Sequence, residues 1–183
     1  MSLDIRCFRA DNLFNNEYPD SLAVVIVEAT DYAGDKAKSP FYFENISSYL
    51  INFTINDQSI NGRPLEWDDT NNNFRELFYY LFSYTGREGP CKNGPNVTLR
   101  DWGRGFAIWV FDQLGGLEHG EMEKANRSNF GTSKLKIDFA QAIGTAKTVI
   151  IYGKFNDHWE LDNMGQVTAA GRAVTTGLRG RNI

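Results

Sequence analysis

Alternation of apolar and polar side chains marks two segments of the chain as half-buried β-strands. In 49–55 the side chains of Tyr49, Ile51, Phe53 and Ile55 share one side of an extended chain, and in 133–141 the pattern recurs with Leu135, Ile137 and Phe139. A period of two is the spacing of a strand with one face on a core and the other in solvent. We therefore predict that both sets of apolar residues belong to the core.

Continuous apolar runs indicate further strands. The runs LAVVIVEAT (22–30) and FAIWVF (106–111) are rich in β-branched and aromatic residues and lack alternation. This pattern is typical of strands buried on both faces, and we interpret 22–30 as a central strand. We also predict strands around Ile5 and Phe8, over 147–155, and at 159–161, where the last would extend a sheet.

The hydrophobic period changes once along the chain. Apolar residues then follow the spacing of one face of a helix, at Phe74, Leu77, Phe78, Leu81 and Phe82. We predict one helix here. The segments 61–73 and 86–105, which contain Pro64 and two Gly-Pro pairs, are predicted to be loops.

These elements predict an all-β protein. About eight antiparallel strands with one inserted α-helix favour a β-sandwich of jelly-roll type over an immunoglobulin-like domain, which would also need a Cys…Trp…Cys pattern. We assign residues 1–167 to one domain. Residues 168–183 contain Arg172, Arg179 and Arg181 and no acidic residue, and we predict a flexible tail.

Composition and charge limit the classes of partner that the protein is expected to bind. The net charge of −4 argues against a general nucleic-acid surface, so only weak, salt-sensitive contact through the three tail arginines is expected. No apolar run has transmembrane length and the first residues contain no signal-peptide core. We expect a soluble protein without a membrane partner, whose Cys7 and Cys91 are reduced thiols.

Catalytic patterns are weak. His119, Glu121 and His158 could supply the ligands of a cupin-like metal site, but His119 lies in a Gly- and Glu-rich segment rather than in a His-x-His strand pattern, and two surface histidines are the simpler interpretation. The chain contains neither a Gly-x-Ser-x-Gly motif nor a phosphate-binding glycine loop. We predict no enzyme, no metal and no cofactor.

Two tryptophans lie in predicted loops, Trp67 and Trp102, and we expect both to be exposed. Exposed aromatic residues stack on sugars or pack against a neighbouring subunit, and we favour packing because aromatic residues are enriched at interfaces. A glycan-binding jelly roll, such as a lectin or a viral attachment head, is the alternative function.

Four short motifs occur in a distinctive order within residues 20–167. They are Ser39-Pro40-Phe41 with Phe43, Phe74-Arg75 through Leu81-Phe82 with Thr85-Gly86, Gly105-Phe106 through Phe111-Asp112, and Trp159-Glu160-Leu161-Asp162 with Gly165 and Val167. In order and spacing the chain resembles the C-terminal jelly roll of the double jelly-roll major capsid proteins of Polinton and adintovirus type elements. The family carries two jelly rolls in each subunit, whereas this chain has room for one.

The resemblance implies a structural role without catalytic residues. It implies a homotrimer that contacts neighbouring capsid proteins, a place in the virion capsid, and assembly in the nucleus or cytoplasm of the host cell. The region 61–105 would form the capsomer tower or the trimer contacts. Within it we nominate four aromatic interface residues: Trp67, Tyr79, Tyr80 and Trp102.

Overall fold

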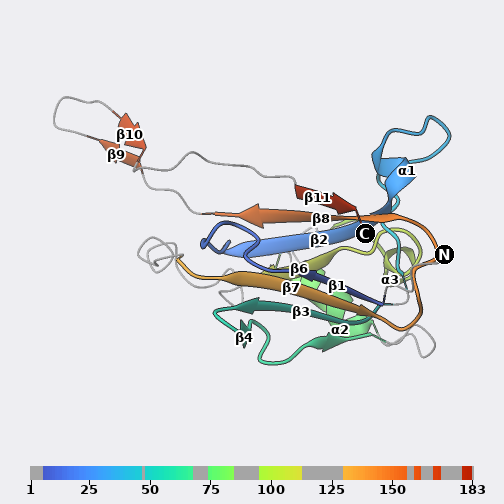
Figure 1. Cartoon of the computed structure of the whole chain (residues 1–183), viewed down its shortest axis with the longest axis horizontal. Helices are drawn as coiled ribbons and strands as arrows, with labels where there is room; N and C mark the ends of the chain where they lie inside the picture. The colour runs from blue at the N-terminus through green and yellow to red at the C-terminus, as the bar shows by residue number, and fades with distance from the viewer. Residues whose placement is uncertain are drawn as a thin grey trace.

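Two antiparallel β-sheets form the body of the protein in a computed structural model (Figure 1). The structure describes residues 6–46, 48–67, 74–84, 95–112, 130–155, 159–161, 167–169 and 179–182. Within these residues the fold is an antiparallel β-sandwich, so the predicted all-β sandwich is confirmed, while its jelly-roll topology stays a prediction.

Each sheet combines strands from the beginning and the end of the chain. The five-stranded sheet contains β1 (Cys7–Ala10), β7 (Ser133–Phe139), β3 (Ser48–Ile55), β4 (Gln58–Ser59) and β5 (Leu65–Glu66), and the last two both pair with β3. The four-stranded sheet has the order β11 (Arg179–Asn182), β8 (Lys147–Lys154), β2 (Ser21–Glu28) and β6 (Trp109–Asp112). Every one of these pairings is antiparallel.

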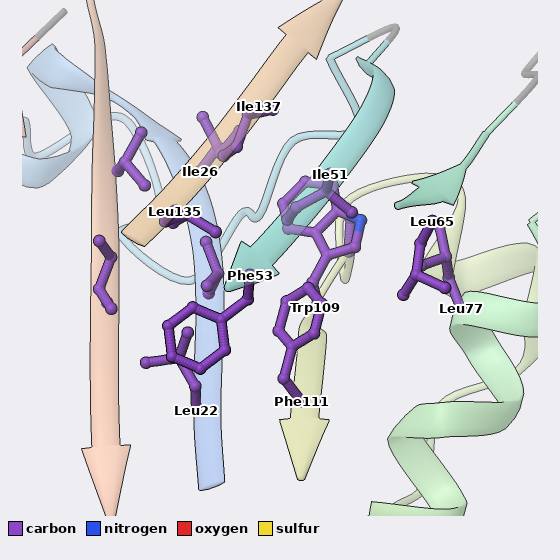
Figure 2. Packing of buried hydrophobic residues seen from close by; sticks show 14 of the residues in the cluster. Leu22, Ile26, Ile51, Phe53, Leu65, Leu77, Trp109, Phe111, Leu135 and Ile137 are labelled. Atoms are coloured by element: carbon purple, nitrogen blue, oxygen red, sulfur yellow. The ribbon is translucent and has the colours of Figure 1, made fainter. Parts of the chain in front are cut away.

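The predicted alternation is confirmed in β3 and β7. Their buried side chains, which point toward the other sheet, are Ile51, Phe53, Ile55, Leu135, Ile137 and Phe139. Figure 2 shows Phe53 beside Leu22 and Phe111 of the four-stranded sheet, and Leu135 beside Ile26 of the same sheet. The rings of Phe53 and Phe111 have centroids 5.8 Å apart. The side chain of Tyr49 lies outside the described part of the structure.

A tight turn fixes the register of β3 and β4. Ile55 pairs with Gln58, and the two residues between them, Asn56 and Asp57, have φ angles of 50° and 65°. Two positive φ angles define the type I′ turn that suits the twist of a hairpin, and Asn and Asp tolerate them well.

The strand predicted over 22–30 is central, as expected, because β2 lies between β8 and β6. Its inner residues Leu22, Val24 and Ile26 are buried. On its outer side Val27 is buried, whereas Ala23 and Val25 are only half-buried. The expectation of complete burial on both faces is therefore only partly correct.

The predicted helix is α2 (Arg75–Tyr84), which buries Leu77 and Leu81. Leu77 lies near Leu65 of β5, and the helix runs beside β6 (Figure 2). The structure adds two four-residue helices, α1 (Ala29–Tyr32) and α3 (Leu99–Trp102), so α2 is the one helix of more than four residues within the described ranges. None of the helices in the described ranges is long and apolar enough to cross a membrane.

The C-terminal segments differ from the expectation for 159–161. Among the described residues, the strand β9 (Trp159–Leu161) pairs with β10 (Val167–Ala169) and with no strand of the two larger sheets, so the prediction that it extends the main sheet is wrong. Four residues of the segment predicted as a tail form β11 and pair with β8. Arg172 lies outside the described residues, and the domain boundary at residue 167 stays a prediction.

Candidate interaction surface

The two tryptophans nominated as interface residues are buried. Trp67 is 3% exposed and Trp102 is 0% exposed. Together with Phe74 and Trp109 they form an aromatic cluster, in which the ring centroids of Trp67 and Trp102 are 5.0 Å apart and Phe74 stacks on Trp102 at 5.6 Å. The prediction that both tryptophans are exposed is wrong, because both indoles pack against each other and against Phe74 and Trp109. Neither indole is available to a partner in this structure.

A capped helix holds Trp102 in place. Thr98 Oγ1 accepts a hydrogen bond from the Asp101 backbone N–H at 3.2 Å, and the Thr98 backbone N–H donates to Asp101 Oδ2 at 3.3 Å. The Thr98 hydroxyl also donates to this carboxylate at 2.6 Å, and these bonds hold the pKa of Asp101 below its ordinary value. The indole N–H of Trp102 then donates to the carbonyl oxygen of Ile108 at 3.1 Å.

We expect Thr98→Ala to lower the free energy of unfolding by about 0.5–2 kcal/mol, which is the usual cost of losing an N-cap. Urea denaturation measures this loss. Thr98→Ser keeps the hydroxyl and serves as the control. Equal midpoints for the alanine and serine variants would show that the cap contributes nothing to stability.

The two nominated tyrosines lie on α2 and differ in exposure. Tyr79 is exposed and Tyr80 is half-buried. The Tyr80 hydroxyl donates to Glu76 Oε1 at 3.1 Å, and Arg63 Nη2 donates to both oxygens of Glu76 at 2.9 Å. Burial, followed by the bond to Glu76, raises the pKa of Tyr80. Of the four nominated residues, Tyr79 is the one that is openly accessible.

Three other exposed aromatic residues lie on two segments that meet near the end of β2. Phe41 is 71% exposed, Tyr42 is 49% exposed and Phe106 is 46% exposed. We call these three residues the aromatic rim. In the sequence, Phe41 and Tyr42 belong to the aromatic run after Ser39-Pro40, which contributed to the family resemblance but gave no indication of exposure.

Backbone hydrogen bonds join the two segments that carry the rim. The Phe43 N–H donates to the carbonyl of Gly105 at 2.8 Å, and the Ala107 N–H donates to the carbonyl of Phe43 at 3.3 Å. These bonds form a parallel bridge between Phe43 and Phe106. The rim is therefore anchored to the chain that enters β6.

Gly105 allows Tyr42 to lie against the backbone. A Cβ atom at position 105 would lie 2.4 Å from Tyr42 Cε2, and the φ angle of Gly105 is +128°. The φ angle favours glycine, because a side chain here would be strained, and a Cβ atom would also displace the tyrosine ring. The Tyr42 ring therefore lies directly against the Gly105 backbone at the surface.

The outer faces of the two sheets differ in polarity. The five-stranded sheet presents charged side chains, Arg9, Lys134, Lys136 and Asp138, of which Lys136 and Asp138 form an ion pair at 2.6 Å. The four-stranded sheet presents instead Ala23 opposite Tyr152 and Val25 opposite Ile150. We call these four residues the outer apolar face. An antiparallel sheet that meets only water normally carries polar residues there, so this face is a second candidate contact region.

The residues of the metalloenzyme hypothesis, His119, Glu121 and His158, lie outside the described residues. Within the described ranges, no three side chains of His, Cys, Asp or Glu gather as a metal site would require.

Comparison of the chain with protein-family models, with curated proteins and with solved structures finds no match.

Proposed function

We propose that this protein is a structural capsid domain of jelly-roll type, and that it associates with copies of itself into trimeric capsomers through the aromatic rim. The exposed rim carries the proposal. Three large aromatic side chains in water are costly, and rigid aromatic residues supply much of the binding energy at protein interfaces. The rim is held by backbone bonds and by the contact of Tyr42 with Gly105.

The strand pairings support the jelly-roll part of the proposal. The consecutive strands β2 and β3 pair with the consecutive strands β8 and β7, respectively. Both connections, β2 to β3 and β7 to β8, cross from one sheet to the other. A long antiparallel ribbon folded across a sandwich produces these pairings, and jelly rolls are built in this way.

A shell requires each subunit to contact more than one neighbour, because a single closed three-fold contact produces only an isolated trimer. The outer apolar face gives the chain a second region for contact with neighbouring capsid proteins. Tyr79 is a further accessible aromatic residue in the region 61–105. In this proposal the protein resides in the virion capsid.

The glycan-binding alternative loses support, since Trp67 and Trp102 are buried.

Sedimentation velocity over a range of protein concentrations tests the proposed self-association. We expect Phe41→Ser and Phe106→Ser each to raise the dissociation constant by about thirtyfold or more, as for an interface hot spot of about 2 kcal/mol. The free energy of unfolding should change by less than about 0.5 kcal/mol, since both side chains are exposed.

Phe130→Ser is the matched control. Phe130 is also exposed, but it pairs with Glu17 before β2 begins, whereas the rim adjoins the end of β2. This variant should associate like the wild-type protein. A wild-type protein that stays monomeric at high concentration would contradict the proposal, and so would equal effects of all three substitutions.

A further inference from the structure

The segment that carries Phe41 and Tyr42 connects β2 to β3 and includes α1 (Figure 1). All residues from Tyr32 to Tyr42 are exposed. Burial of apolar surface therefore contributes little to fixing this part of the chain, although the Tyr42 ring lies against the Gly105 backbone. Other interactions must hold the segment.

Two lysines form a continuous network of ion pairs with acidic residues of this region. Lys38 pairs with Glu28 and, at 3.2 Å, with Asp31, and it donates to Thr30 Oγ1 at 3.1 Å. Lys147 Nζ lies 2.5 Å from a carboxylate oxygen of Glu44 and 3.9 Å from one of Glu28. Glu28 thus joins the two lysines.

The network holds the chain both before and after the two rim residues Phe41 and Tyr42. Lys38 precedes Phe41 by three residues, and Glu44 follows Tyr42 by two residues. Lys147 is buried in β8, so its pair with Glu44 is screened by salt less than an exposed pair would be. The backbone N–H of Glu44 also donates to the carbonyl of Ile26 at 2.9 Å, which ties the same residue to β2.

We propose that Lys147 and Lys38 are positioning residues for the aromatic rim, so that self-association depends on this ion-pair network as well as on apolar contact. The inference rests on the proposed self-association. It adds that charged residues which are not themselves in the rim control how strongly the rim associates. Lys147 fixes the chain after the rim, and Lys38 fixes it before the rim. Loss of either charge leaves the aromatic rings present but no longer held in one arrangement.

The test compares Lys147→Met with Lys147→Arg in the full chain. Amide hydrogen exchange at Phe43 and Glu44 reports the position of the segment, and sedimentation velocity reports self-association. We expect the methionine variant to exchange at least about tenfold faster at both amides and to dissociate about tenfold more readily. The arginine variant keeps the charge, and its values should lie closer to those of the wild-type protein.

Lys136→Met is the matched control, because it removes an ion pair with Asp138 on the other sheet. It should leave exchange at Phe43 and Glu44 unchanged. If Lys147→Met does not fold, Lys38→Met provides the same test on an exposed residue, with faster exchange expected at the Tyr42 amide, which donates to Ser39 at 3.2 Å.

Two failures of the experiment can be told apart. A monomeric wild-type protein would contradict the proposed function, while the exchange rates would still report whether the lysines position the segment. If the wild-type protein associates but the methionine variants match Lys136→Met in exchange and association, the positioning role is overturned and the proposed function stands.

Discussion

Trp102→Ala is expected to lower the free energy of unfolding by about 3–5 kcal/mol. Its indole is fully buried and contacts the rings of Trp67, Phe74 and Trp109. Alanine would leave a cavity that rigid aromatic neighbours fill poorly, and the carbonyl of Ile108 would lose its donor. A loss of this size is a large part of the stability of a typical domain.

Urea denaturation followed by circular dichroism measures the effect. Trp102→Phe retains a ring but not the indole donor, so its loss should be smaller than that of the alanine variant. Tyr152→Ala removes an exposed aromatic side chain and is expected to change stability by less than about 0.5 kcal/mol. If Trp102→Ala were no more destabilising than Tyr152→Ala, Trp102 could not occupy the core.

Gly105→Ala is expected to reduce both stability and self-association. The backbone conformation at this position costs a residue with a side chain about 1–3 kcal/mol. In addition, the new methyl group would overlap the Tyr42 ring and push it from its place in the rim. We expect a loss of about 1–3 kcal/mol in the free energy of unfolding, together with a dissociation constant raised by at least about tenfold.

The Gly105→Ala, Tyr42→Ala double variant separates the two causes. Removal of the tyrosine ring relieves the overlap but not the backbone strain, so the two substitutions should be less than additive in stability. Gly144→Ala is the control, because a Cβ atom there meets no other atom within 4 Å and its φ is ordinary. Strict additivity would show that Tyr42 does not contact position 105.

The local pattern of side chains was sufficient to predict β3, β7 and α2. In each of them one face is buried and the other is half-buried or exposed, so hydrophobicity repeats with the period of the element. The short helix α3 also had a local signal, the Thr98-x-x-Asp101 spacing of a capping box, which we did not use.

The burial of Trp67 and Trp102 had no such signal. Both tryptophans lie among polar residues and turn formers, so their surroundings in the sequence resemble a surface loop. Their burial depends on Phe74 and Trp109, which come from other elements and reach the same place only in the folded chain. The tertiary contacts decide the environment of these residues.

Sequence patterns also could not predict that the candidate contact regions are exposed. Val25 and Ile150 belong to apolar runs that would look the same under a covering layer as in water. Only the arrangement of the sheets shows that both are half-exposed, whereas Val24 and Val149 are buried. For the rim, the bridge between Phe43 and Phe106 brings distant segments together.

The pairing of β2 with β8 has a consequence for synthesis of the protein. The strand β2 is synthesised well before either of its partners, because β6 and β8 both follow it in the chain by many residues. Strand pairs of such long sequence separation form slowly, and an unpaired apolar strand is prone to aggregate. The nascent chain must therefore keep β2 from wrong partners until β6 and β8 have been made.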